Sequence, residues 1–585
     1  MGYFLRQDKK KKGVYLQIYE TYWDKDKKQA RTRSIEKIGY VCDLVSDELP
    51  DPVAHYKDVV KQMEANRVAE VVRTTRASAF DTCQEKNVGC FLLSTLLEEL
   101  EVKDVIDILA STRNFQFSIY DMIHQLIIAR VVYPCSKSKT VSSVFPTLYR
   151  NIEMSEDQVY EGLNFIGESY KKYIELFNHQ YEQHFKRDFS HVYFDCTNYY
   201  FEIDLPKEDK QKGKSKENRH EPIIGQALLL DGDLVPLAMQ MYPGNNSEKP
   251  YIRGVIEEMK QRYKVEGRTV QVADKGLNCA RNIYSAVKEA NDGYIFSKSI
   301  HGTGLSAAEK EWLLLENDKN VFTDFRDENG KIRFRLKSCI DTYEYSFEEI
   351  DPVTSKKKTV RFEVKELRIV SYTPALAKKQ KAEIKKMADK AANYTTFKKY
   401  AKGDLGATSK YVKETAFDKD GNTVTPAYTL DENAIEEDLK YAGYNLLVTS
   451  ELSMNPLDVY KTYHNLWKIE ECFRITKSFL DGRPVYCQKK ESIYGHFLIC
   501  YLSLFLLRVM EIKCFNDEIN SYDLIQFIRD FRVVKRDNRT YINISKNQSV
   551  NEKIKSLTGL TNLDALYLTQ KEIDNLFDST MLIST

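Results

Sequence analysis

The stretch "PIIGQALLLDGDLVPLAMQMYPG", residues 222–244, decides the fold, because it consists of two apolar runs separated by a turn signal. The Asp-Gly pair at positions 231 and 232 is typical of a tight hairpin turn between strands. Just before it, "HVYFDCTNYYFEI" at 191–203 is rich in aromatic residues, which favour a strand. Together these segments predict three consecutive antiparallel strands.

A strand–helix alternation follows this hairpin. "EKPYIRGVIEEMKQRY" at 248–263 and "CARNIYSAVKEAN" at 279–291 have the periodicity of helices. "RTVQVAD" at 268–274 and "DGYIFSKSI" at 292–300 have the composition of short buried strands. Three antiparallel strands followed by this alternation predict a mixed α/β sheet.

Residues 300–441 interrupt the alternation with long segments of period-2 alternation, such as "KTVRFEVKELRIVSY", and we expect an inserted β-rich domain there. Between Lys378 and Lys402 this domain has nine Lys and two acidic residues on a helix-periodic segment. Such a helix is either a solvated face or a surface that follows a phosphate backbone. "GYNLLVTSEL" at 443–452 then returns to a buried strand.

The 585 residues are too many for one hydrophobic core, so several domains are expected. Residues 1–40 have eleven Lys and Arg against five acids and alternate as a hairpin, which either is a solvated edge or contacts DNA. The predicted domains are a basic β-hairpin (1–48), a helical domain expected to bind DNA (49–188), a first core segment (189–299), the β-rich insertion (300–441), a second core segment (442–515) and a C-terminal helical region (516–585).

The net charge, the cysteine pattern and the length of the apolar runs exclude several classes of protein. The net charge is +1, so a nucleic-acid partner would have to meet local basic patches. The eleven Cys are scattered without a CxxC pair, so neither a disulfide framework nor a zinc site is indicated. The longest apolar run, Phe497 to Leu507, is too short to cross a bilayer, and the start has no apolar signal core. We expect a cytoplasmic protein without a membrane partner.

Two apolar strands each carry one aspartate. Asp195 lies within the strand at 191–203, and Asp274 ends the strand at 268–274. A carboxylate in a buried strand loses solvation and stays charged only with a cation or a hydrogen-bond donor. Sites of α/β folds also gather at strand ends. For Asp274, just ahead of Gly276, the alternative is a carboxylate that caps the turn.

A third carboxylate lies in "YHNLWKIEECFRITKSFLDGRPVY", residues 463–486, which is predicted to be an amphipathic helix. At 3.6 residues per turn, Tyr463, Glu470 and Lys477 fall on one stripe with apolar residues. Glu470 is therefore expected to face the protein and Glu471 to face solvent. A plain ion pair between Glu470 and Arg474, four residues later, is the alternative.

Asp195, Asp274 and Glu470 are thus placed on a strand, a strand and a helix. If they converge without basic partners, they form an oxygen-only site suited to Mg²⁺ or Mn²⁺. Two such ions about 4 Å apart can activate an attacking oxygen and stabilise a leaving oxygen in phosphodiester chemistry.

With Asp195, Asp274 and Glu470 in this order on two strands and a helix, the chain resembles the DDE transposases of bacterial insertion sequences. It looks like the group whose RNase H-like catalytic fold contains a β-rich insertion domain before the catalytic Glu. The signature of that group is Tyr, two residues, Arg, three residues, Glu, six residues, Lys. Tyr463, Glu470 and Lys477 match this spacing, and Leu466 stands at the Arg position. "YFDCTN", "VADKGLN" and "GNNSEKPYI" resemble the first-Asp strand, the second-Asp strand and the turn before the next helix, so the resemblance covers about residues 185–510.

The resemblance implies a multidomain α/β fold: an RNase H-like mixed sheet with an inserted β-rich domain, an N-terminal β-hairpin and helical region, and C-terminal helices. It also implies that Asp195, Asp274 and Glu470 are catalytic and hold two Mg²⁺ ions, with Mn²⁺ as a substitute. Water would cut DNA at the element's end, and the freed 3′-OH would attack target DNA. The expected partners are double-stranded DNA, as terminal inverted repeats and target, and a second copy in a homodimer, in the bacterial cytoplasm at the nucleoid.

Four further residues are implied to contact DNA. Tyr463 and Lys477 would grip the phosphate backbone near the cut, as a hydrogen-bond donor and a point charge. Arg474 would supply the charge that is missing at Leu466. Trp467, beside the stripe, would either stack on an unpaired base or pack in the core.

Three other functions stay open on the sequence. A decayed or repurposed sequence-specific DNA-binding protein would lack catalysis, although the three carboxylates are all present. A related nuclease would hydrolyse DNA without strand transfer, and a joining assay with pre-cut ends separates the two. A two-carboxylate glycosidase is remote, because Lys477 beside the Glu suits phosphate better than sugar.

Overall fold

The computed structural model divides into two compact units, which are described separately. Unit 1 contains residues 1–88, 531–546 and 561–576, and unit 2 contains residues 89–530, 547–560 and 577–585. The structure describes residues 2–24, 27, 29–46, 49–78, 85–217, 219–301, 304–317, 320–350, 355–397, 402–417, 423–537, 539–546, 548–579 and 582–583.

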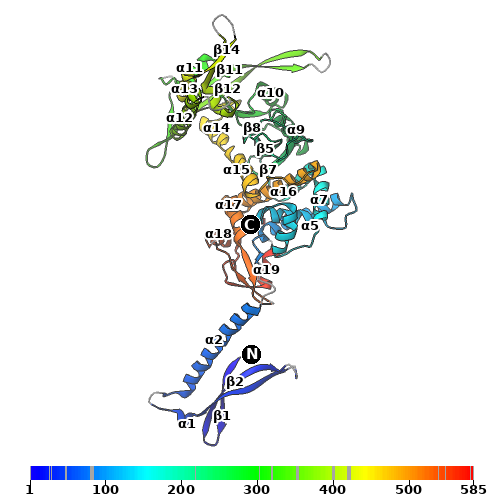
Figure 1. The fold of residues 1–585 in the computed structure, drawn as a ribbon, viewed down its shortest axis with the longest axis vertical. Helices are drawn as coiled ribbons and strands as arrows, with labels where there is room; N and C mark the ends of the chain where they lie inside the picture. Colours follow the sequence, from blue (N-terminus) through cyan, green and yellow to red (C-terminus); the bar gives the residue numbers. More distant parts are fainter. Residues whose placement is uncertain are drawn as a thin grey trace. The chain divides into compact units, whose positions relative to one another are not determined.

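Unit 2 is organised around a nine-stranded sheet with the order β10-β11-β12-β15-β9-β8-β5-β6-β7. Its strands are β5 (His191–Tyr200), β6 (Ile223–Leu230), β7 (Pro236–Pro243), β8 (Val270–Ala273), β9 (Gly293–Lys298), β10 (Thr323–Arg326), β11 (Ile332–Ile350), β12 (Lys357–Tyr372) and β15 (Tyr444–Thr449). Five of these strands, β5, β7, β8, β11 and β12, are labelled in Figure 1.

The central part of this sheet confirms the predicted mixed α/β arrangement. β5, β6 and β7 pair antiparallel in sequence order, as the two apolar runs and their turn indicate. β8 pairs with β5 and β9 pairs with β8, both in parallel. The connections contain α9 (Tyr251–Arg262) before β8 and α10 (Ala280–Tyr284) before β9.

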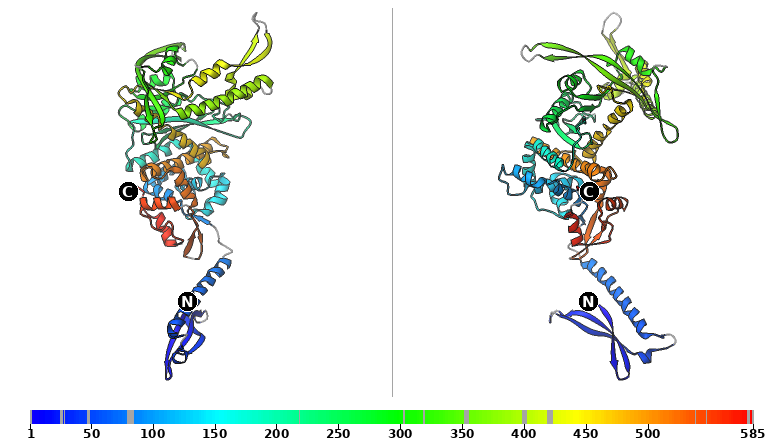
Figure 2. Two further views of the ribbon diagram at one scale, coloured as in Figure 1. Left: turned by 90° about the vertical axis from the view of Figure 1, so that its left-hand side faces the viewer. Right: turned by 180° about the vertical axis from the view of Figure 1, so that it is seen from behind.

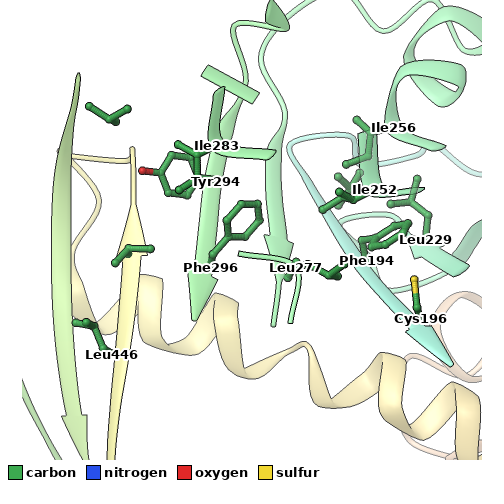
Figure 3. Packing of buried hydrophobic residues seen from close by; sticks show 14 of the residues in the cluster. Phe194, Cys196, Leu229, Ile252, Ile256, Leu277, Ile283, Tyr294, Phe296 and Leu446 are labelled. Atoms are coloured by element: carbon green, nitrogen blue, oxygen red, sulfur yellow. The ribbon is translucent and has the colours of Figure 1, made fainter. Parts of the chain in front are cut away.

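Alternation along β5 separates its two faces. Val192, Phe194 and Cys196 belong to one buried cluster together with Ile252 and Ile256 of α9 (Figure 3). Because successive strand residues point to opposite faces, Asp195 lies on the face away from this cluster. The hydrophobic core therefore holds the strand from one side and leaves its aspartate on the other.

The insertion extends the same sheet. β12 pairs with β15, and β15 pairs with β9, so the strands of the insertion continue the core strands edge to edge. A second, small sheet of β13 (Val412–Phe417) and β14 (Thr423–Leu430) packs near α12 (Pro374–Phe397) and α13 (Glu432–Lys440). The predicted basic helix corresponds to α12, and its Lys398 and Lys399 lie outside the described residues.

Helices build the rest of unit 2. α16 (Lys490–Val509), continued by η6 (Met510–Cys514), is longer than the apolar run that the sequence shows. By length and composition it could cross a membrane, but 94% of its apolar window is buried inside the protein, as expected of a core helix. It lies among the N-terminal helices of this unit in both views of Figure 2. These helices are α3 (Phe91–Glu99), α4 (Val102–Ala110), α5 (Ile119–Val132), α6 (Lys137–Lys139), α7 (Glu156–Glu168) and α8 (Tyr170–His184).

Unit 1 differs from the prediction in both of its sheets. The predicted hairpin corresponds to β2 (Gly13–Asp24) and β3 (Gln29–Tyr40), and β1 (Tyr3–Lys10) adds a third strand. Lys25, Asp26 and Lys28 of the predicted charged turn lie outside the described residues.

The region predicted to be helical beyond residue 516 also contains strands. It has α17 (Ser521–Asp530) in unit 2, α18 (Gln548–Thr558) and α19 (Gln570–Phe577), but β4, β16, β17 and β18 form a four-stranded sheet in unit 1. Sequence periodicity missed these strands because each has only three or four residues. Their bounds are β4 (Glu85–Asn87), β16 (Arg532–Lys535), β17 (Thr540–Asn543) and β18 (Tyr567–Thr569).

Close packing of α16 on α7 depends on two glycines, Gly167 and Gly495, and a substitution at Gly495 tests this. A Cβ at Gly495 would lie 2.2 Å from the carbonyl oxygen of Leu163, so Gly495→Ala must push the helices apart. We expect it to lower the free energy of unfolding by about 1–3 kcal/mol. Gly254→Ala on α9 is the matched control, because nothing lies within 4 Å of its Cβ, and it should stabilise by about 0.5–1 kcal/mol. Denaturant unfolding measures both, and equal effects would contradict the close approach.

Candidate active site

The two aspartates end up side by side. In the parallel ladder Phe194 pairs with Ala273, so Asp195 and Asp274 are the next residues on neighbouring strands. Tyr193 and Val272 also pair, and the aspartates follow them by two residues, which places both carboxylates on one face. Adjacent strands are about 4.8 Å apart. The sheet alone therefore brings two carboxylates together.

A helix junction crosses this edge of the sheet. α14 (Pro456–His464) contacts β8, and α15 (Trp467–Arg474) contacts β5. The hydroxyl of Tyr463 donates to Oδ1 of Asp274 at 2.9 Å, and Asn465 Nδ2 donates to the Tyr193 hydroxyl at 3.4 Å. Tyr193 is on the same face as Asp195. The junction is thus tied to both strands beside their aspartates.

The stretch predicted as one helix is two helices. At the junction the N–H of Leu466 donates to the carbonyl of Tyr463, and that of Lys468 to Asn465, so the bonds are of the i−3 type. Such a turn winds about 120° per residue, against 100° in an α-helix. The prediction of one unbroken helix through Tyr463, Glu470 and Lys477 is therefore wrong.

The burial of the two glutamates is the reverse of the prediction. Glu471 is buried, and its carboxylate lies 3.2 Å from Lys468 Nζ and 3.7 Å from Arg508. Glu470 is exposed. The expectation that Glu470 faces the protein and Glu471 the solvent is wrong, because the buried Glu471 is accommodated by two cations, Lys468 of α15 itself and Arg508 of α16.

The exposed side of α15 presents Trp467, Glu470 and Arg474. Trp467 is 48% exposed, so its core-packing alternative is wrong, and a contact with DNA stays a prediction. Arg474 Nε donates to the Tyr522 hydroxyl at 2.8 Å, which leaves the ion pair with Glu470 unsupported. Burial raises the pKa of Tyr463, and the charges of Asp274 and Glu470 add to this rise. Glu470 is therefore within electrostatic reach of the hydroxyl that contacts Asp274.

A basic side chain lies beside Asp195, which the sequence analysis did not expect. Lys216, on the loop between β5 and β6, has Nζ 3.7 Å from Asp195 Oδ1 and 3.5 Å from Glu248 Oε1. The expectation of carboxylates without basic partners is wrong here. Burial raises the pKa of Asp195 to about 6, although Lys216 and the N–H of Cys196 lower it. The negative charges of Glu248 and Asp274 contribute to the rise.

Lys477 reaches the same site from η5 (Ile475–Phe479). Its Nζ donates to Glu217 Oε1 at 3.1 Å, and Arg483 forms an ion pair with the same carboxylate. Burial lowers the pKa of Lys477 to about 8, with Lys216 adding to the fall and Asp195 opposing it. Glu217 of the β5–β6 loop thus pairs with both Lys477 and Arg483. The resemblance assigned Lys477 to a phosphate contact.

A cavity of about 550 Å³ is lined by Lys216 and Glu248, which pair with each other next to Asp195. Its lining includes Asn198, Lys214, Lys216, Asn245, Glu248 and Gly276. Lysines and amides around a carboxylate site suit a phosphate group next to a cation.

The described side chains near the aspartates do not form a complete set of ligands for a divalent cation. In the described part of the chain, no three His, Cys, Asp or Glu side chains lie close enough together to hold one metal ion. Asp195 and Asp274 supply hard oxygen ligands, and the raised pKa of Asp195 indicates that its charge is under-compensated. The pair supplies two ligands of the kind that Mg²⁺ prefers, and Mg²⁺ itself and Glu470 as a third ligand stay predictions.

Three residues of this site were missed by the sequence analysis. Lys216 and Glu217 lie in "KEDKQKGKSKENRHE", residues 207–221, a strongly charged connection between two buried strands, and this charge was a usable signal. Glu248 lies in the "GNNSEKP" turn, which the resemblance matched as a turn before the next helix without giving the Glu a role.

No protein-family profile and no curated protein sequence matches this chain. One solved structure similar to it is a piggyBac transposase synaptic complex with hairpin DNA. The two are 11% identical, the alignment covers 85% of each chain, and the TM-score is 0.33.

The raised pKa of Asp195 predicts a pH-dependent cost to stability. Its folded value of about 6 exceeds the ordinary 3.8, so ionisation destabilises the fold as pH rises from about 4 to 6. Asp195→Asn should therefore stabilise the protein at pH 7.5 by up to about 3 kcal/mol, and much less at pH 4.5. Thermal melting in EDTA at the two pH values measures this. The exposed Glu470→Gln is the control and should change stability by less than about 0.5 kcal/mol. An Asp195→Asn variant less stable than wild type at pH 7.5 would contradict the prediction.

Proposed function

We propose that this protein is a DDE-type transposase of an insertion sequence, which cleaves DNA at the element's ends and transfers the strands to target DNA. The observation that carries the proposal is the placement of Asp195 and Asp274 on one face, at neighbouring parallel strands, under the α14–α15 junction. Glu470 follows that junction on the exposed side of α15.

The topology supports an RNase H-like core. In the order β7-β6-β5-β8-β9 the first three strands of the chain are antiparallel, and β8 and β9 run parallel to β5. This is the strand order of an RNase H-like sheet. The insertion between β9 and β15 also stands where the resemblance expects a β-rich domain, ahead of the helix with Glu470.

The residues of the site have separate tasks in the proposed reaction. Asp195, Asp274 and Glu470 would bind Mg²⁺, which supplies activation of the attacking oxygen and stabilisation of the leaving oxygen when bound. Tyr463 holds the Asp274 carboxylate in place with its hydroxyl. Lys216 and Lys477 are positioned to neutralise a phosphate beside Asp195. For this, Lys477 must exchange Glu217 for the phosphate, and Glu470 must turn toward the aspartates.

One observation favours a second candidate, a DNA-binding protein without catalysis. Glu470 is exposed, and no three-ligand metal cluster is formed among the residues that the structure describes. The two candidates differ in whether the wild-type protein cleaves DNA, and the first also requires Glu470 for that cleavage.

The neighbouring glutamates provide a matched pair for that question. Glu470→Gln should reduce Mg²⁺-dependent cleavage at least about 100-fold without a change in stability, because it removes a metal ligand. Glu471→Gln should lower the free energy of unfolding by about 1–2 kcal/mol, because it removes one of the two buried carboxylates that pair with Arg508 and Lys468, while Glu511 remains as the other. A plasmid carrying the genomic DNA on both sides of this coding sequence is the substrate. Unchanged cleavage with Glu470→Gln would overturn the assignment of the third ligand.

Strand transfer needs its own test. Asp195→Asn and Asp274→Asn should abolish cleavage and also the joining of pre-cut ends to a second plasmid, while binding of the ends stays within about threefold of wild type. Wild-type cleavage without joining would identify a nuclease instead. The absence of both reactions in wild-type protein that still binds the ends would favour the non-catalytic candidate.

A further inference from the structure

The three-stranded sheet of unit 1 has one covered and one open face. Leu16 pairs with Gln7 and Gly39, and Ile18 pairs with Leu5, so these residues share a side of the sheet. Leu16 and Ile18 are fully buried, and α1 (Val41–Leu44) and α2 (Pro52–Ser78) contact the strands. We call this side the covered face.

The opposite side, the open face, concentrates aromatic and basic side chains. Register places Phe4 opposite Tyr19 and Tyr15 opposite Tyr40, and Trp23 lies at the far end of β2. Phe4 is 38% exposed and Trp23 is 52% exposed. Between the rings lie small hydroxyl residues and three cations: Thr21, Thr32, Ser34, Arg6, Lys10 and Lys37.

The Lys and Arg side chains of the two faces have different neighbours: aromatic rings on the open face and carboxylates on the covered face. On the open face, Arg6 lies 5.0 Å from the ring centre of Tyr19, and Lys10 lies 4.2 Å from that of Tyr15. Among the described strand residues Asp8 is the one acid on this face, and it pairs with Arg6 at 2.9 Å. On the covered face, Arg31 and Arg33 pair with Asp24 and Glu20.

The open face therefore keeps net positive charge over aromatic rings, although the whole chain is nearly neutral. We propose that this face reads double-stranded DNA by lying in its major groove, and that it is the segment that recognises the element's ends. The proposal rests on the proposed function, because it assigns the base-reading task of that transposase to particular side chains.

Dimensions and side-chain chemistry fit a groove better than a protein partner. Three strands about 4.8 Å apart span about 10 Å, and the major groove is about 12 Å wide. β-Sheet readers of DNA place strand side chains against base edges. Hydroxyls such as those of Thr32 and Ser34 can donate to or accept from bases. In the turn after β1, Lys11 is exposed for a phosphate, whereas Lys12 pairs with Asp43 at 2.8 Å.

Two triple variants of the full-length chain compare the faces at equal charge. The open-face variant is Arg6→Gln, Lys10→Gln and Lys37→Gln, and the covered-face control is Lys9→Gln, Arg31→Gln and Arg33→Gln. Each removes three positive charges from strands β1 and β3. The probe is the duplex that wild-type protein enriches from a pool with 20 randomised base pairs.

The open-face variant should bind this duplex at least about tenfold more weakly, and its slope of log affinity against log salt should fall by about 2.7. The control should bind within about threefold of wild type. The proposal would be overturned if both variants lost affinity for the duplex equally, or if both bound it as tightly as wild type. Thermal melting must show both variants folded like wild type, which exposed substitutions allow.

A second measurement leaves the open face unchanged. With Trp312→Phe and Trp467→Phe, Trp23 is the one remaining tryptophan of the three in the chain. Its emission should be quenched by the selected duplex at one site per chain and less by an RNA duplex of the same sequence. Unchanged emission with bound DNA, or a preference for RNA, would overturn the proposal.

These outcomes separate this inference from the proposed function. If wild-type protein cleaves and joins ends but the two triple variants behave alike, only the inference about the open face fails. If the protein enriches no duplex and shows no cleavage, the proposed function fails with it.

Discussion

The carboxylates of Asp195, within β5, and of Asp274, directly after β8, repel each other, and the fold around these two parallel strands keeps them together. The core on the opposite face fixes Phe194 and its neighbours, so the aspartates cannot separate without disrupting that packing. Burial raises the pKa of Asp195, which means that the folded protein maintains an unfavourable charge. Such a cost is expected where a site awaits a cation.

Lysines provide part of the compensation in the structure described here. Lys216 lies between Asp195 and Glu248, and Glu217 of the same loop engages Lys477 and Arg483. One charged loop thus contacts both the carboxylates and the cations of the site. If a metal ion and a DNA phosphate bind as proposed, they would replace these internal pairs, and the loop would have to move.

Much of the sheet could be predicted because local signals decide it. The Asp-Gly turn and the apolar runs identify β6 and β7, and the alternation after them identifies β8 and β9. The placement of Asp195 and Asp274 followed from their strands. The short strands β16 to β18 gave too few residues for periodicity, and β1 was missed although it pairs along its whole length with β2.

The orientation of Glu470 could not be predicted, since it depends on tertiary packing. A tightened turn at Leu466 changes the phase of α15, and Arg508 from a distant helix stabilises the burial of Glu471. Neither effect is visible in the periodicity of residues 463–486. The charged loop at Lys216 and Glu217 was visible in sequence, but its contact with Asp195 required the paired strands on either side.

The central proposal is that Asp195 and Asp274 share a divalent cation. Anomalous diffraction from crystals of the protein with Mn²⁺ and an end duplex tests this claim most directly. We predict an anomalous peak between the two carboxylates, with Glu470 turned toward it and Lys477 on a phosphate. A structure at millimolar Mn²⁺ with no peak there, and with Lys216 still beside Asp195, would contradict it.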